Sequence, residues 1–407
     1  MRSEPARLSF EIQSRDGSAR TGLLRLAHGE VRTPAFIPLA TKASVRGLSS
    51  EEVASLGYEM VLGNTFHLHL APGEELIEGR GGLHRFMGWE RPIITDSGGF
   101  QVFSLAHGGV ADEIKGRRGE MAGNAKVDIS EEGVRFQSLL DGSDRFLGPE
   151  ESMRIQAALG SDIALAFDEC TPFHADRDYT ARSTERTHRW LDRCLAWHDG
   201  NGPDGQAMFG IVQGGVHEDL RRESAAYVAE AAVDGIAIGG TLGKEKEEMR
   251  GVLELTAPLL PEEAPRHLLG IGEVDDLMAG IGVGIDLFDC AVPTRLARHG
   301  VALAPEPDAR FRIDLTKAHY AEDDSPLVEG CPCEACSGYS RAYLHYLARS
   351  KELTGARLLT LHNLTYMERL VSEARKAIEG GRYEAYAEAV LKGGTPWTAG
   401  GGPPPAS

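Results

Sequence analysis

Short apolar runs alternate with longer amphipathic segments along most of the chain. Apolar runs that can form strands lie at 35–39, 60–65, 92–96, 163–167, 207–212, 236–238, 267–271 and 285–288. Segments with helical spacing separate them, as at 149–159, 217–232 and 274–281. Eight strands that alternate with helices predict a closed (β/α)8 TIM barrel. A doubly wound open sheet is the alternative, but no Gly-rich dinucleotide fingerprint follows the first strand.

The regular alternation covers 35–300, and four other segments depart from it. Residues 1–34 predict an N-terminal antiparallel hairpin that covers the barrel, with a turn at Arg15–Gly17. The stretch 104–148 is polar and Gly-rich, and too long for an ordinary connection, so we expect an irregular insertion. Residues 301–392 predict a metal-binding subdomain with closing helices at 364–380 and 383–391. The Gly/Pro-rich tail 393–407 predicts disorder.

The charge balance limits the kinds of partner. The chain has 43 basic and 61 acidic residues, for a formal charge of -18, which disfavours non-specific binding to nucleic acid. Any nucleic-acid site must therefore be a local basic patch, and net charge alone favours a small-molecule substrate. The first residues lack the apolar core of a signal peptide, and no apolar run approaches membrane-spanning length. We therefore expect a cytoplasmic protein without a membrane partner.

Three of the six cysteines are closely spaced and predict a metal site. Cys331, Cys333 and Cys336, together with His362, supply a complete tetrahedral ligand set for one structural Zn²⁺. His345 competes as the fourth ligand, but the sequence around His362 suggests a helix start from which the imidazole can reach back. Three unrelated buried thiols are the alternative.

Polar residues follow several of the predicted strands. These residues are Asp96, Asp168, Gln213, Gly239 with Gly240, and Asp289. Each has a simpler interpretation alone, such as a helix cap or a partner in an ion pair. Because parallel strands of a barrel end at one rim, together they predict a pocket rich in donors and acceptors. There Asp96 can act as an acid or base, and Phe100 can stack on a flat ring.

These motifs, in this order, resemble those of the tRNA-guanine transglycosylases of the bacterial queuosine pathway. The matching segments are 96–101, 167–170, 210–215, 238–240, 288–295 and the cysteine cluster with His362. The resemblance implies an irregular TIM barrel with a zinc subdomain. It also implies exchange of guanine at the wobble position of tRNAs with a GUN anticodon for a 7-deazaguanine.

The resemblance also implies roles for individual residues. Asp289 matches the nucleophile that forms a covalent tRNA intermediate, and Asp96 the general acid/base. The base-binding positions are Phe100, Asp168, Cys170, Gln213, Gly239 and Gly240. Among the tRNA-binding positions, Leu39, Leu62 and Asn64 match those that line the ribose and phosphate site, and Arg295 and Arg298 match the arginines that hold the anticodon loop. The family implies a homodimer.

The identity of the incoming base rests on a few positions. Cys170 is the residue found in bacterial members of the family. Thr241 and Gly243 differ from the usual bacterial residues, and Gly243 matches the eukaryotic form that uses queuine. We expect 7-aminomethyl-7-deazaguanine, with queuine as the alternative.

Three other classes of protein compete with this interpretation. A non-catalytic partner subunit would lack the nucleophile, yet Asp96 and Asp289 are both present. An archaeal relative acting on the tRNA D-arm usually carries additional RNA-binding domains. A small-molecule barrel hydrolase is favoured only by the net charge.

Overall fold

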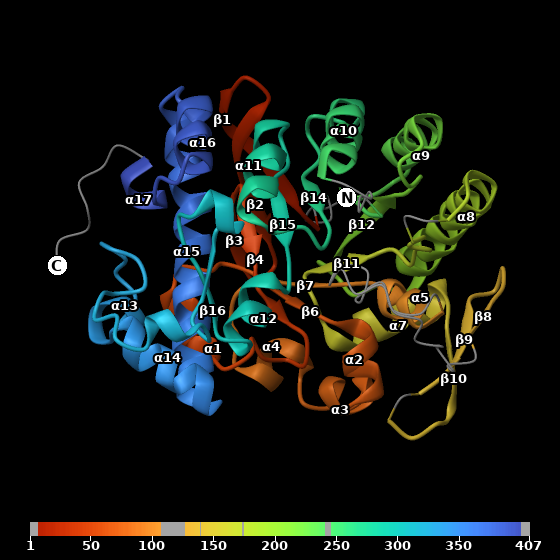
Figure 1. The fold of residues 1–407 in the computed structure, drawn as a ribbon. Helices are drawn as coiled ribbons and strands as arrows, with labels where there is room; N and C mark the ends of the chain where they lie inside the picture. Colours follow the sequence, from red (N-terminus) through yellow and green to blue (C-terminus); the bar gives the residue numbers. More distant parts are fainter. Residues whose placement is uncertain (1–6, 107–126, 139, 173–174, 241–245, 400–407) are drawn as a thin grey trace.

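A computed structural model describes residues 7–106, 127–138, 140–172, 175–240 and 246–399 of the chain (Figure 1). No helix among these residues is long and apolar enough to cross a lipid bilayer.

The centre of the molecule is a ring of parallel strands in the order β4-β15-β14-β13-β12-β11-β7-β6-β5. Their bounds are β4 Ala35–Ile37, β5 Leu39–Ala40, β6 Val61–Gly63, β7 Ile93–Thr95, β11 Ile163–Leu165, β12 Ala207–Val212, β13 Gly235–Ile238, β14 Arg266–Leu268 and β15 Leu287–Asp289. Pro38 alone separates β4 from β5, so one segment pairs with β15 before the proline and with β6 after it. This arrangement closes the ring and confirms the predicted barrel.

Helices follow the strands and surround the barrel. They are α1 Ser50–Ser55, α2 Thr65–Leu70, α3 Glu74–Glu78, α4 Gly82–Met87, α7 Pro149–Leu159, α8 Arg177–Asn201, α9 Glu218–Glu230, α10 Lys246–Thr256, α11 Val274–Gly282 and α12 Val292–Arg298. Short 3-10 turns lie at η1 Ala257–Leu259, η2 Pro307–Ala309 and η3 Ala318–Tyr320.

The N-terminal sheet closes the amino end of the barrel. It contains the predicted hairpin, β1 Ser9–Asp16 and β2 Ala19–Leu26, and a third antiparallel strand, β3 Gly29–Thr33. Leu24 and Val31 of this sheet belong to the same buried cluster as the barrel residues Leu165 and Phe209. Because this sheet packs against the barrel core, it covers the amino ends of the strands and leaves the carboxyl ends, where barrel enzymes bind their ligands.

The insertion is more regular than predicted. After α5 Gly99–Ala106, the strands β8 Val127–Ile129, β9 Val134–Gln137 and β10 Asp144–Leu147 form an antiparallel sheet. The expectation of an irregular stretch over 104–148 is therefore wrong for 127–147, where alternating side chains of β9 such as Val134 and Phe136 are buried. Residues 107–126 lie outside the described part.

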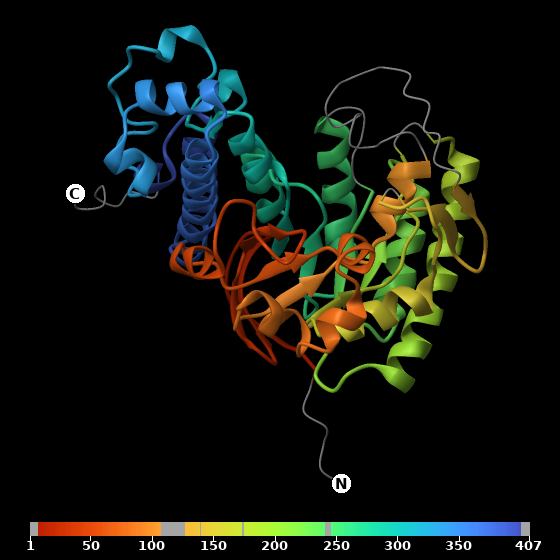
Figure 2. The same cartoon turned by 90° about the horizontal axis from the view of Figure 1, so that it is seen from below.

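The C-terminal part is built around one long helix, α15 Leu353–Glu379. The other elements are β16 Val301–Leu303, β17 Arg312–Asp314, α13 Glu334–Gly338, α14 Arg341–Ser350, α16 Tyr383–Leu391 and α17 Pro396–Ala399. Figures 1 and 2 show α15 along one side of the barrel and α8 on the opposite side. Helix α15 contacts β1, β2 and β4 as well as α13 and α14, so it joins the barrel to the metal-binding segment.

Two predictions for this region are wrong. The closing helix begins at Leu353 rather than at 364, so His362 lies inside the helix and not at its start. The tail was expected to be disordered over 393–407, but α17 is helical and Trp397 is buried. The Trp397 indole N–H donates to the carbonyl of Glu329 at 3.3 Å. Residues 400–407 lie outside the described part.

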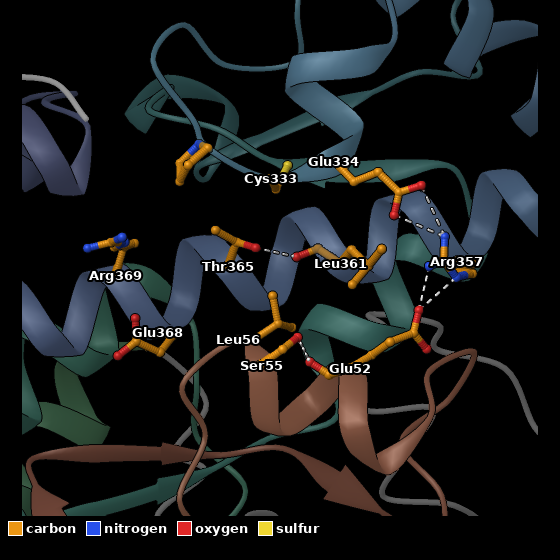
Figure 3. Close-up of a pocket in the computed structure, with 11 residues that line it drawn as sticks. Glu52, Ser55, Leu56, Cys333, Glu334, Arg357, Leu361, Thr365, Glu368 and Arg369 are labelled. Carbon is orange, nitrogen blue, oxygen red and sulfur yellow. Dashed lines mark hydrogen bonds and ion pairs between the residues drawn. The ribbon is translucent and has the colours of Figure 1, made fainter. Parts of the chain in front are cut away.

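Arg357 of α15 links α1 of the barrel to α13 of the metal-binding segment. Its guanidinium pairs with Glu52 on one side and with Glu334, at 3.2 Å, on the other (Figure 3). A polar cavity of about 360 Å³ lies between these helices, and its lining includes neither Asp96 nor Asp289. The cavity is therefore separate from the predicted active site.

Candidate active site and zinc centre

The strand ends bring the predicted polar residues to one rim of the barrel. Asp96 directly follows β7, Gln213 follows β12, Gly239 follows β13, and Asp289 is the last residue of β15. Asp168 lies just beyond β11. The parallel ring places all five at the carboxyl ends of the strands, where barrel enzymes carry their active sites.

Asp96 is held by the start of the α2 segment. The Thr65 N–H donates to Asp96 Oδ1 at 2.8 Å, and the Asn64 amide donates to Oδ2. Burial raises the pKa of Asp96 to about 7, and the negative charges of Asp289 and Asp168 act in the same direction, whereas the Thr65 N–H opposes them. Asp96 can therefore give or take a proton near neutral pH, and Asp289 is near enough to influence it.

Asp289 is buried and held through only one of its oxygens. His267 Nε2 lies 2.9 Å from Asp289 Oδ1, and the Gly270 N–H donates to the same oxygen at 3.2 Å. Among the described residues, Asp289 Oδ2 accepts no hydrogen bond. One carboxylate oxygen is thus available to a ligand.

Asp168 and Gln213 form a second polar group in the same rim. The Gln213 amide donates to Asp168 Oδ2 at 2.6 Å, and the Ser97 hydroxyl donates to Oδ1 at 3.2 Å. Both Asp168 and Gln213 are buried. Burial raises the pKa of Asp168 to about 6. Asp168 forms no ion pair with a described residue, so the simpler role of an ion-pair partner is not what holds it there.

Two glycines leave the space that the Gln213 side chain occupies. A Cβ at Gly239 would lie 2.7 Å from Gln213 Nε2, and one at Gly240 would lie 2.4 Å from Gln213 Oε1. Arg221, fully buried, donates to the carbonyls of Val212, Gly215 and Gly240. These contacts hold the ends of β12 and β13 in register.

The remaining predicted residues lie on the elements around this rim. Phe100 is in the first turn of α5 and half-buried, and Cys170 lies two residues after Asp168. Burial raises the pKa of the Cys170 thiol to about 12, so it is neutral. Leu39 is in β5, Leu62 in β6, and Asn64 caps α2.

The two predicted arginines lie on α12, directly after Asp289. Burial lowers the pKa of Arg298, and the charges of Arg46 and Arg295 add to this effect. Neither Arg295 nor Arg298 has a carboxylate partner among the described residues. Thr241 and Gly243, on which the size of the incoming base depends, lie outside the described residues.

The sequence did not indicate His267, Ser97 or Arg221. His267 is the middle residue of the short strand β14 rather than the residue at its carboxyl end, and Arg221 is one of many arginines on helices. Ser97 stands within the Asp96 motif, where it could have been considered. Only the contacts in the folded chain distinguish these residues.

The four predicted metal ligands come together and are buried. The sulfurs of Cys331, Cys333 and Cys336 lie 3.7, 3.5 and 3.3 Å from His362 Nδ1. Tetrahedral zinc with ordinary Zn–S and Zn–N bonds separates such atoms by roughly 3.6 Å. His362 Nε2 lies 2.8 Å from the carbonyl of Leu303, which leaves Nδ1 for the metal. These side chains fit one structural zinc ion.

Other groups that contain possible ligands do not fit a metal equally well. His345, the alternative fourth ligand, forms a hydrogen bond from its Nδ1 to the carbonyl of Leu315. His28 and His84 flank Asp162, but their rings are stacked with an interplanar angle of 19°, so their lone pairs cannot both point at one ion. Glu273, near two other acids, is neutralised by Lys246, Arg310 and Arg312.

The fold and the site define a barrel enzyme with paired carboxylates at the carboxyl ends of its strands and a separate structural zinc centre. The model of the family described as "Queuine tRNA-ribosyltransferase" matches residues 15–394. The chain belongs to this family, as the resemblance of its motifs predicted.

Relatives with that name match over almost their whole length. One from Roseiflexus sp. (strain RS-1) is 49% identical over 388 residues, which is 92% of this chain and 97% of the relative. One from Pelotomaculum thermopropionicum is 47% identical, covering 95% of this chain and 98% of the relative. One from Nitrosomonas eutropha is 48% identical, covering 93% of this chain and 99% of the relative.

Proposed function

We propose that this enzyme exchanges guanine at the wobble position of tRNAs with a GUN anticodon for 7-aminomethyl-7-deazaguanine, a step of queuosine biosynthesis. The observation that carries the proposal is that Asp96 and Asp289 lie at the same rim of the barrel, at the carboxyl ends of β7 and β15, and the charge of Asp289 helps to raise the pKa of Asp96. Asp96 has a pKa near neutral pH, so it can release a proton. Asp289 has one oxygen, Oδ2, that accepts no hydrogen bond from the described residues. The match to the queuine tRNA-ribosyltransferase family supports the choice of tRNA as the substrate.

The two carboxyls divide the exchange into two displacements. Asp289 attacks C1′ of the ribose, the bond from C1′ to the base nitrogen breaks, and its electron pair leaves with guanine, which takes a proton from Asp96. The new base then gives a proton to Asp96, its ring nitrogen bonds to C1′, and Asp289 leaves as a carboxylate. Two inversions restore the original configuration at the sugar.

Base recognition fits the polar group around Asp168. A carboxylate there can accept from the N–H groups of a guanine-like edge, while the Gln213 amide and the backbone at Gly239 and Gly240 face its carbonyl edge. Phe100 can stack on the ring. The target nucleotide must leave its stack to reach this rim, as base-modifying enzymes require.

The size of the incoming base stays a proposal. Cys170 favours 7-aminomethyl-7-deazaguanine, whereas Gly243 favours queuine. Steady-state incorporation of each base into the same tRNA decides between them, and a preference for queuine would contradict the first choice.

We further propose a cytoplasmic homodimer in which Leu39, Leu62 and Asn64 line the site of the ribose and phosphate, and Arg295 and Arg298 hold the anticodon loop. Exposed apolar surface on the C-terminal part supports dimerisation: Tyr346 is 62% and Leu353 is 86% exposed. A molar mass of one chain by light scattering would contradict the dimer. The zinc centre has four protein ligands and no open position, so no step of the exchange uses it.

The central test is a denaturing gel of the enzyme with substrate tRNA. We expect a covalent complex with the wild type and none with Asp289→Asn, because an amide cannot replace the carboxylate nucleophile. Filter binding should show that the variant still binds tRNA. An adduct with Asp289→Asn would overturn the role of Asp289, and the absence of tRNA binding by the wild type would favour a small-molecule barrel hydrolase.

A further inference from the structure

His267 is a buried histidine at the centre of the active site that the proposed exchange does not yet use. It lies in the middle of β14, next to the strand that ends at Asp289, and its side chain is fully buried. Its Nε2 atom lies 2.9 Å from Asp289 Oδ1. We propose that His267 is a positioning residue that determines which oxygen of Asp289 attacks the ribose; the inference rests on the proposed function.

The surroundings of the imidazole decide where its proton lies. His267 Nδ1 is buried and has no hydrogen-bond partner among the described residues. A proton on Nδ1 alone would leave a buried N–H unpaired and turn the Nε2 lone pair toward the carboxylate oxygen. The neutral tautomer with its proton on Nε2 avoids both costs. His267 therefore donates to Asp289.

The two donors to Asp289 converge on a single oxygen. His267 Nε2 and the Gly270 N–H both reach Oδ1, while Oδ2 accepts no hydrogen bond from the described residues. The carboxylate consequently cannot rotate without losing two hydrogen bonds to a charged group. Oδ2 is the oxygen left to form the bond to C1′.

The same contacts serve both displacements. When Oδ2 bonds to C1′ and guanine leaves with its electron pair, Oδ1 becomes the carbonyl oxygen of the ester and keeps both donors. When the second base attacks C1′, the bond from C1′ to Oδ2 breaks and its electron pair returns to the carboxylate. Part of that negative charge develops on Oδ1, where His267 and Gly270 already point their N–H groups.

Two amide substitutions test whether His267 acts by placing an N–H donor at the position of Nε2 or only by being polar. In His267→Gln the amide nitrogen is as far along the side chain as Nε2, whereas in His267→Asn it reaches only the level of Nδ1. We expect His267→Asn to slow formation of the covalent tRNA complex roughly 10- to 100-fold, as expected when a hydrogen bond to a charged group is lost. We expect His267→Gln to retain the rate within about fivefold.

The matched control is His198→Asn, which alters another buried histidine, near the end of α8, whose Nδ1 contacts Arg7 rather than a residue of the active site. We expect this control to form the complex at the wild-type rate. Filter binding should give tRNA dissociation constants for both His267 variants within about twofold of wild type, so that the loss appears in kcat and not in KM.

Equal rates for His267→Asn and His267→Gln would overturn the inference, as would a loss confined to tRNA binding. Unfolding of His267→Asn is detected by circular dichroism, and a normal rate for a folded His267→Leu would then overturn the inference independently. If the wild type itself forms no covalent complex, the proposed function fails rather than the role of His267.

Discussion

At the scale of single residues, the site contains two carboxyls, Asp96 and Asp289, whose surroundings differ. Asp96 is surrounded by protein and by the charges of Asp289 and Asp168, which disfavour its ionised form. Asp289 instead receives two N–H donors on one oxygen. Two carboxyls of the same chemistry can therefore take opposite roles, proton donor and nucleophile, because their surroundings differ.

This difference predicts the pH dependence of the first displacement. Because the pKa of Asp96 is raised to about 7, its carboxyl is protonated below that pH and loses the proton above it. We expect the single-turnover rate of covalent complex formation, measured with saturating enzyme, to fall about tenfold per pH unit above pH 7. Asp96→Asn should be slow, with no such fall. A constant wild-type rate between pH 6 and pH 9 would contradict the assignment of Asp96 as the acid.

The two carboxylates were predictable from the sequence, whereas the residues that form hydrogen bonds to them were not. Asp96 and Asp289 follow apolar runs, and the rule that parallel strands end at one rim brings them together. His267 is the first residue of the apolar run 267–271, where a single histidine is usually a core residue. Its contact with Asp289 depends on the register of β14 against β15, and the sequence does not specify that register.

At the scale of elements, the strand order followed from the sequence, but several element boundaries did not. The α15 helix begins at Leu353 although Thr354 and Gly355 are poor helix formers. Packing against α12, α13 and α14 outweighs that local preference. In the tail, composition predicted disorder, but the indole of Trp397 packs against the ring of Tyr366 with centroids 6.1 Å apart. Tertiary contacts of this kind leave no periodic signal in the sequence.

The N-terminal sheet is joined to the barrel by a buried ion pair between β2 and the segment before β15. Arg20 contacts both oxygens of Asp286, and the two side chains are 1% and 0% exposed. Arg20→Met leaves the Asp286 charge buried without its partner, so we expect the free energy of unfolding to fall by about 3–5 kcal/mol in urea denaturation.

The double variant Arg20→Met with Asp286→Asn should recover most of that loss, because the unpaired charge is gone. The exposed pair of Arg15 with Glu262 is the control, and Arg15→Ala should cost at most about 1 kcal/mol. Equal costs for Arg20→Met and Arg15→Ala would show that burial of the ion pair does not matter.

At the scale of the whole molecule, an acidic protein must attract RNA through a small surface. The formal charge is -18, yet Arg46, Arg295 and Arg298 lie close enough for their charges to interact. Among the described residues, Arg295 and Arg298 have no carboxylate partner, so their charges are available to phosphates. If this local cluster binds tRNA, as we propose, the net charge does not conflict with a tRNA substrate.

The cluster predicts a specific salt dependence. We expect Arg295→Ala to weaken tRNA binding and to reduce the slope of log K against log salt by about 1, because one phosphate contact is lost. Arg222→Ala is the control, since Arg222 is paired with Glu218 on the outer helix α9 and should leave the slope unchanged. Filter binding across a salt series gives both slopes; identical slopes for the two variants would exclude Arg295 from the tRNA surface.

The zinc centre connects the two ends of the molecule through α15. His362 lies in the buried middle of this helix, whose contacts extend from α13 beside the cysteines to β1, β2 and β4 of the barrel. Structural zinc in small domains binds with about 10–16 kcal/mol, comparable to the total stability of a protein. Loss of the metal should therefore unfold more than the cysteine loop.

We accordingly expect Cys336→Ser to lose the single equivalent of zinc measured by atomic absorption and to lower the melting temperature strongly. Cys194→Ser is the matched control, because this buried thiol contacts Phe167 and Pro149 rather than the metal site, and it should keep the zinc. During gradual chelation of the wild type, the amount of covalent tRNA complex should fall in proportion to bound zinc and return when zinc is restored, since the metal acts through folding. Full activity in a zinc-free protein with an unchanged melting temperature would refute a structural role for the metal.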